Sequence, residues 1–274
     1  MAELTIIDTH CHLDAAEFDD YRDQVIQEAT QSGVGMIVIP AVTPEHFSKV
    51  ADLSQQYPAC CYALGMHPMY IDSISPSDIA KLNALIAKTL QYDNKLVAIG
   101  EIGLDFYVTK HNKETQEYFF SEQLKLAKAY DLPVILHVRR AIDDVLKHLR
   151  RMQVKGGIAH AFNGSMQQAE VFIDLGFKLG FGGAMTYPRA LNIREIAKNL
   201  PLETIVLETD SPDMPPVWLD KKQHNSPKEL LSIAKELADL RGLSVSQIIE
   251  ITRKNSMDVL PKIANLCTRL EALH

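Results

Sequence analysis

Cysteine is scarce in this sequence and is not arranged as a disulfide scaffold. The chain of 274 residues has four cysteines, Cys11, Cys60, Cys61 and Cys267, and no CxxC pair. Small disulfide-stabilised folds carry more cysteines, and CxxC pairs are typical of zinc and redox sites. We therefore expect reduced thiols in a cytoplasmic protein.

Long apolar runs are also missing. No run approaches the roughly 18–20 residues that cross a membrane, and the opening MAELTIID resembles the start of a strand rather than a signal peptide. The chain contains no GxSxG, HExxH, GxxxxGK[ST] or GxGxxG motif either. The sequence therefore predicts neither a membrane protein nor any of the catalytic sites that these motifs mark.

The chain has no excess of positive charge. Its 28 Lys and Arg face 35 Asp and Glu, which gives a formal net charge of −7. This balance argues against broad electrostatic binding of nucleic acid, although the count leaves out any bound metal ion. With 46% hydrophobic residues the chain can bury a sizeable core, so disorder is excluded.

Eight short apolar runs alternate with segments of helical periodicity. The runs are continuous rather than alternating, as expected for strands that are covered on both faces. Eight such units predict a closed parallel (β/α)8 TIM barrel of α/β class, formed as a single domain over residues 1–274, with extra C-terminal helices over 244–264. A doubly wound open sheet is the alternative, but it usually has fewer strands and a Gly-rich first turn, which this sequence lacks. The expected strands are 4–8, 36–40, 60–66, 96–100, 133–138, 157–162, 177–183 and 204–209.

Histidines and carboxylates follow five of these strands, at the end where barrel active sites lie. His10 and His12 are two residues apart, so in an extended chain they point to the same face. A lone histidine on an apolar strand is usually a core residue, but His137 and His160 follow successive strands at matching depth. Six converging ligands exceed what one tetrahedral ion needs and favour two divalent ions with a shared carboxylate, able to activate water for hydrolysis. The expected metal ligands are His10, His12, Glu101, His137, His160 and Asp210.

Several residues beside these ligands allow more than one interpretation. Asp105 could support a ligating histidine or cap the segment that follows it. Arg139 could bind phosphate or pair with a neighbouring acid. Phe106 and Tyr107 could stack on a base, but we expect them to cover the barrel rim. Glu208 is expected to face away from the site, on the opposite face of its strand from Asp210.

Seven motifs in order along the chain resemble those of the TatD-type metal-dependent hydrolases, and especially the YjjV-like branch of that family. The resemblance covers nearly the whole sequence, and spaced motifs in the right order are far more specific than any one of them. The motifs are DTHCHLD (8–14), GMHP (65–68), GEIGLDFY (100–107), ILHVRRA (135–141), AHAFNGS (159–165), GGAMTYPR (182–189) and LETDSPDMPP (207–216).

This resemblance implies a TIM barrel with two divalent ions (Zn²⁺, Mn²⁺ or Mg²⁺) and a deoxyribonuclease activity on phosphodiester bonds. It implies that His10, His12, Glu101 and Asp210 hold one ion, while Glu101, His137 and His160 hold the other. Glu101 and Asp210 would also be catalytic, Asp210 by orienting or deprotonating the attacking water. His67 would face the substrate phosphate, and Arg139 is the second expected substrate-binding residue.

Two positions depart from the pattern of many relatives. Arg140 stands where His-x-Arg-Asp-Ala has its acid, and His224 stands where Arg-Asn-x-Pro has its arginine. A histidine is a weaker and pH-dependent partner for phosphate, although Lys221 and Lys222 lie close by in the sequence. These changes concern substrate preference and leave the expected metal ligands in place.

Three classes of function remain open. The first is a metal-dependent nuclease acting on single-stranded DNA ends, consistent with basic residues near the expected mouth. The second is a hydrolase of a small amide, ester or phosphoester, including an aminoacyl-tRNA deacylase, which the acidic net charge and the lack of a basic-aromatic stripe favour. The third is a non-catalytic metal-binding scaffold. No obligate protein partner and no membrane attachment is expected.

Overall fold

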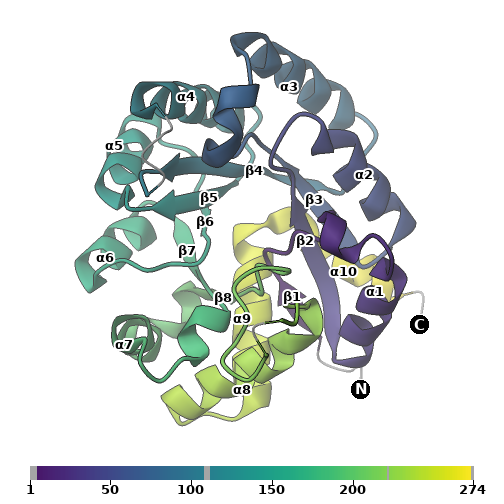
Figure 1. Cartoon of the computed structure of the whole chain (residues 1–274), viewed down its shortest axis with the longest axis vertical. Helices are drawn as coiled ribbons and strands as arrows, with labels where there is room; N and C mark the ends of the chain where they lie inside the picture. The colour runs from purple at the N-terminus through teal and green to yellow at the C-terminus, as the bar shows by residue number, and fades with distance from the viewer. Residues whose placement is uncertain (1–4, 108–111, 221, 273–274) are drawn as a thin grey trace.

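The structure, a computed structural model, describes residues 5–107, 112–220 and 222–272. Eight parallel strands form one sheet in the order β1 to β8, and helices between the strands surround it (Figure 1). The expected TIM barrel is therefore confirmed. The strands are β1 Ile6–Asp8, β2 Val34–Pro40, β3 Cys60–Leu64, β4 Leu96–Asp105, β5 Val134–Arg139, β6 Gly157–Ala159, β7 Phe177–Phe181 and β8 Ile205–Leu207.

Ten α-helices and five short 3-10 helices are present in the described part of the chain. The α-helices are α1 Arg22–Gln31, α2 His46–Gln56, α3 Pro76–Thr89, α4 Lys113–Ala129, α5 Ile142–Met152, α6 Met166–Asp174, α7 Leu191–Asn199, α8 Leu230–Arg241, α9 Val245–Val259 and α10 Pro261–Glu271. The 3-10 helices are η1 Ala16–Phe18, η2 Pro68–Ser73, η3 Gly183–Thr186, η4 Leu202–Thr204 and η5 Pro227–Glu229. No helix among the described residues is both long and apolar enough to cross a membrane.

The first and last strands meet through hydrogen bonds from the backbone. The amide of Thr9 donates to the carbonyl of Leu207 over 3.1 Å, and the amide of Asp210 donates to the carbonyl of His10 over 2.8 Å. These bonds lie at the carboxyl ends of β1 and β8. They hold the segments that carry His10 and Asp210 side by side.

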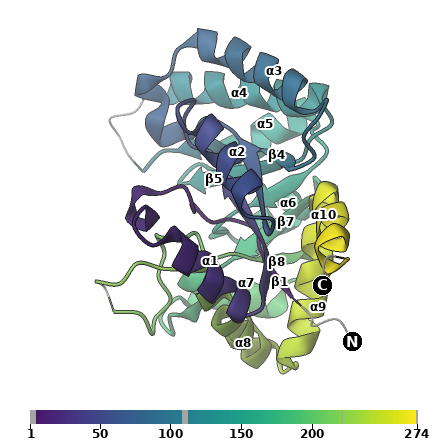
Figure 2. The same cartoon turned by 90° about the vertical axis from the view of Figure 1, so that its right-hand side faces the viewer.

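Alternate residues of the strands enter two separate cores, which explains why the strands are apolar on both faces. One set, including Ile37 and Tyr62, packs with the surrounding helices. The other set, including Met36 and Cys61, packs inside the barrel with residues of α9 and α10. Figure 2 shows α10 on one side of the barrel and the segment after β8 on the other. The polar residues of the mouth therefore lie opposite α10.

Strand β4 is longer than the sequence predicts. The apolar run ends at residue 100 and predicts a strand end there, with Glu101 at the mouth, but β4 continues to Asp105. Its pairing with β5 shifts between Ile99 and Ile102, where three residues of β4 correspond to two of β5. A bulge of this kind redirects side chains locally, and bulges are frequent next to active sites. Glu101 lies in this irregular stretch and is 1% exposed.

Candidate metal centre

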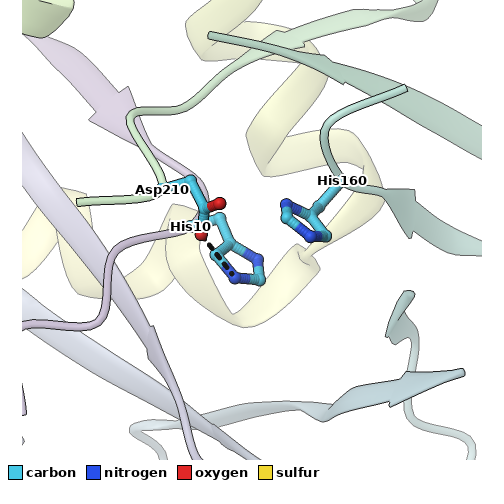
Figure 3. A group of neighbouring side chains, drawn as sticks. All are labelled: His10, His160 and Asp210. Atoms are coloured by element: carbon cyan, nitrogen blue, oxygen red, sulfur yellow. Dashed lines mark ion pairs between the residues drawn. The ribbon is translucent and has the colours of Figure 1, made fainter. Parts of the chain in front are cut away.

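The side chains that the sequence places at the strand ends converge on the carboxylate of Glu101. His10 and His12 follow β1, His67 follows β3, and Asp210 follows β8 at a φ of 56°. His137 lies in β5, and His160 follows β6. Figure 3 shows His10, His160 and Asp210 facing one another from three segments that are far apart in the sequence. The structure thus brings together all six expected metal ligands.

Four atoms form what we call the first donor group: Oε2 of Glu101, Nε2 of His10, Nε2 of His12 and Oδ1 of Asp210. His10 Nε2 lies 3.1 Å from the Glu101 oxygen, 3.3 Å from His12 Nε2 and 3.5 Å from Asp210 Oδ1. His12 Nε2 lies 3.4 Å from the Glu101 oxygen and 3.6 Å from the Asp210 oxygen. A tetrahedral ion with bonds of about 2.0–2.1 Å separates its ligand atoms by about 3.3–3.4 Å. These five separations are therefore close to those around a small divalent ion.

The other oxygen of Glu101 faces a second donor group. Its Oε1 lies 2.9 Å from Nδ1 of His137 and 3.2 Å from Nε2 of His160. Nε2 of His67 also lies 3.2 Å from this oxygen. Glu101 thus offers one oxygen to each group, as a carboxylate shared between two ions would.

The position of the ring proton distinguishes His67 from the histidines that are expected to bind metal. The backbone amide of Met69 donates to His67 Nδ1 over 3.1 Å, so a neutral His67 carries its proton on Nε2. Burial lowers the pKa of His67 to about 4, which keeps the ring neutral near pH 7. Its Nε2–H then points at Glu101 and has no lone pair for a metal ion. This arrangement supports a contact with substrate rather than with metal.

Carboxylates orient the other two imidazoles of the second group. Asp105 Oδ2 lies 3.1 Å from Nε2 of His137, and Glu208 Oε1 lies 3.5 Å from Nδ1 of His160. A carboxylate on one ring nitrogen leaves the other nitrogen's lone pair free for metal. Asp105 also accepts a hydrogen bond from the Tyr107 amide at 2.8 Å, so it both supports a histidine and caps the next segment.

The expectation that Glu208 faces away from the site is wrong. Residues two apart on a strand share a face, and Val206 belongs to the barrel interior, so Glu208 also points inward. Its Oε1 accepts a hydrogen bond from the Ala161 amide at 2.5 Å, next to His160. Gly180 of β7 leaves room for this carboxylate, because a Cβ there would lie 2.1 Å from Glu208 Oε2.

Asp8 has a supporting role that the sequence did not predict. Its Oδ2 accepts a hydrogen bond from Thr209 Oγ1 at 2.6 Å, and its Oδ1 accepts from the amides of Thr209 and His10 at 3.0 and 3.2 Å. Burial raises the pKa of Asp8 to about 7, although these hydrogen bonds oppose the shift. The feature of the sequence that could have indicated this role is a carboxylate at the end of an otherwise apolar strand.

The pKa shifts of the histidines indicate that the buried carboxylates of the site favour a nearby positive charge. Burial lowers the pKa of His10 to about 3. Burial also disfavours charge on His12, but Glu101 and Asp210 raise its pKa to about 9 overall. The pKa of His160 is likewise raised well above its ordinary value, mainly by Glu101 acting against burial. A divalent ion would supply this positive charge and displace the protons.

The remaining candidates lie on the rim or beyond it. Arg139 and Arg140 are exposed and contact the ring of Tyr107, while Lys113 lies 4.4 Å from the ring centroid of Phe106. His224 is exposed and lines a cavity of about 200 Å³ beside α1. None of the described residues that line this cavity belongs to either donor group. Lys222 is exposed, and Lys221 lies outside the described residues.

Comparisons with known proteins agree with this geometry. The family model described as TatD related DNase matches residues 7–261. The metal-dependent hydrolase YjjV of Escherichia coli is 41% identical over 251 residues, covering 91% of this chain and 95% of that protein. The human protein named deoxyribonuclease TATDN3 is 31% identical over 275 residues, covering 97% of this chain and 98% of its own. The crystal structure of E. coli YjjV superposes with a TM-score of 0.89 at 39% identity, over 93% of this chain and 98% of that one.

The proton position on His67 predicts that this residue is not needed to hold metal. We expect His67→Gln to retain the metal content of the wild type, measured by elemental analysis after reconstitution and desalting. His137→Gln is the matched control, and it should lose metal because Nδ1 of His137 faces Glu101 at 2.9 Å. Loss of metal from His67→Gln equal to that from His137→Gln would place His67 among the ligands.

The raised pKa of His12 predicts that metal binding releases protons. Below its pKa of about 9 the ring is protonated in the metal-free protein and cannot bind an ion, so apparent affinity should rise from pH 7 towards pH 9. Calorimetry at pH 7.5 in two buffers of different ionisation enthalpy measures the released protons. His224→Gln, which changes an exposed histidine, should release as many as the wild type. A binding heat that is independent of buffer would contradict the expectation.

Proposed function

Because this chain belongs to the TatD-related DNase family of metal-dependent hydrolases, we propose that it cleaves phosphodiester bonds of DNA with two divalent ions. The observation that carries this proposal is the position of Glu101, whose two oxygens face two separate donor groups. The relative named as a deoxyribonuclease favours DNA as the substrate. Single-stranded ends are the form that we expect to enter the barrel mouth.

The donor atoms limit which ions suit the site. Imidazole nitrogens and carboxylate oxygens bind Zn²⁺ and Mn²⁺ well, and Mg²⁺ less readily because it prefers oxygen. Bound divalent ions would neutralise charge on the phosphate and make water a better nucleophile. The first donor group would hold one ion, and Glu101, His137 and His160 would hold the other.

Asp210 is the residue that we assign to proton transfer. Burial raises the pKa of its carboxyl to about 6, although His160 and His12 oppose the shift. A carboxylate with a pKa near 6 is ionised at pH 7 and accepts a proton more readily than an ordinary aspartate. Its side chain is 13% exposed, so it reaches the mouth where water and substrate enter.

His67 has a complementary role in this proposal. Its Nε2–H can donate to an anionic phosphate oxygen that lies near Glu101, because its Nδ1 is occupied by the Met69 amide. A neutral donor avoids repulsion from nearby cations, and its proton is fixed in place before substrate arrives. His67 would thereby orient the phosphate without binding an ion.

The proposal predicts metal-dependent cleavage of a short single-stranded oligonucleotide. Exhaustive chelation should abolish the activity, and Mn²⁺ or Zn²⁺ should restore it. Cleavage at subsaturating substrate should also fall steeply between 50 and 200 mM salt, as binding through phosphate contacts requires. A panel of small esters, amides, phosphoesters and an aminoacyl-tRNA serves as the comparison. Turnover confined to that panel would overturn the proposed nuclease activity. It would favour a hydrolase of small amides, esters or phosphoesters, or an aminoacyl-tRNA deacylase.

Asp210→Asn tests the assigned base. Asparagine keeps one ligating oxygen and adopts a positive φ readily. The backbone conformation at this position, with its φ of 56°, should therefore be preserved. We expect kcat to fall by about 10²- to 10⁴-fold, which is the usual contribution of a general base. Asp213→Asn, an exposed change three residues away, should leave kcat unaltered. Near-native turnover in Asp210→Asn with full metal content would assign the base elsewhere.

A further inference from the structure

Three side chains on the rim of the barrel form a basic-aromatic group that the proposed chemistry does not use. Tyr107 is 47% exposed and follows β4. The guanidinium carbon of Arg139 lies 3.8 Å from the centroid of the Tyr107 ring, and that of Arg140 lies 4.6 Å from it. We call Tyr107, Arg139 and Arg140 the rim cluster. Contact with one ring restricts both arginines before any ligand binds.

The rim cluster adjoins the second donor group. Asp105 pairs with Arg139 in the β4–β5 ladder, and its Oδ2 lies 3.1 Å from Nε2 of His137. The other oxygen of the same carboxylate accepts a hydrogen bond from the Tyr107 amide. A single side chain therefore fixes the position of Tyr107 relative to a histidine of the metal centre.

The positive charge of the rim cluster is not neutralised within the described part of the chain, where neither arginine forms an ion pair. The acids that follow in the sequence have other partners. Asp143 accepts a hydrogen bond from Gln168 at 2.8 Å, and Asp144 lies 3.2 Å from Lys113 Nζ. Two exposed guanidinium groups held beside one ring favour an anion that can contact both.

The backbone of Arg140 supports a functional role. Its φ of 54° lies in the left-handed region, which is disfavoured for a residue with a Cβ. Such conformations concentrate at functional sites, where the surrounding structure holds them in place. In this conformation the Arg140 side chain contacts the same Tyr107 ring as Arg139 does.

We propose that the rim cluster binds a second phosphate of the substrate strand, next to the one that is cleaved. This inference rests on the proposed function and narrows it to chains with at least two phosphates. Guanidinium groups bind phosphate oxygens in a bidentate manner, which a lysine does not reproduce. The cluster lies beside His137, so a strand whose scissile phosphate occupies the metal centre carries its next phosphate over the rim at Tyr107.

Binding tests the cluster independently of catalysis. The probe is a fluorescent single-stranded oligonucleotide with phosphorothioate linkages, which resist cleavage, titrated with metal-loaded protein and followed by anisotropy. Arg139→Ala/Arg140→Ala should weaken binding by about 10- to 100-fold, the usual range for removing charge-assisted hydrogen bonds. The slope of log affinity against log salt should become shallower by about 0.7 for each phosphate that the variant no longer neutralises.

A matched control removes the same charge from the far end of α5. Arg150 and Arg151 are exposed in the last turn of that helix, so Arg150→Ala/Arg151→Ala should bind within twofold of the wild type. Equal weakening in both double variants would overturn the inference and leave only a general charge effect. No binding by the wild type would also overturn it.

Kinetics separate this inference from the proposed function. The substrates are the unmodified oligonucleotide and bis(4-nitrophenyl) phosphate, which has one phosphate. Arg139→Ala/Arg140→Ala should lose about 10- to 100-fold in kcat/KM on the oligonucleotide and none on the small diester. Equal losses on both substrates, or none on either, would refute the second-phosphate site while the nuclease stands. Selective loss of binding in a protein that cleaves neither substrate would refute the nuclease and keep the phosphate site.

Discussion

The centre of this protein depends on the burial of one carboxylate among imidazoles. Glu101 is 1% exposed and lies within 3.4 Å of nitrogens from His10, His12, His67, His137 and His160. Burial alone would raise the pKa of Glu101, but these neighbours hold it well below its usual value. The carboxylate therefore stays ionised inside the barrel. An ionised buried group requires compensating charge, and the surrounding residues are arranged to receive it from a cation.

The supporting carboxylates divide the histidines by role. Asp105 and Glu208 lie on the far nitrogens of His137 and His160, while a backbone amide occupies the far nitrogen of His67. The same side chain thus becomes a ligand or a hydrogen-bond donor according to what lies behind it. Ring orientation is fixed by the strands and by η2, so these roles are set before a metal ion binds.

Much of the fold and of the donor set could be predicted from the sequence, because both follow from local patterns. Continuous apolar runs indicate the strands, and polar residues such as His137 and His160 indicate their ends. The extension of β4 could not be predicted, because a bulge depends on pairing with β5. The role of Asp8 depends on contact with Thr209, far along the chain. The stacking at Tyr107 depends on side-chain conformations, and the prediction for Glu208 failed because residues two apart on a strand share a face.

The meeting of β1 and β8 has a consequence for how the site is assembled. His10 and His12 come from the start of the chain, whereas Asp210 comes from the last strand, and Asp8 joins the two segments through Thr209. The first donor group is therefore complete only when the ends of the sheet have closed on each other. During synthesis an emerging chain cannot offer this group until Asp210, which follows β8, has been made. Tight capture of an ion by the first group is thus a late event, reserved for a barrel that has already closed.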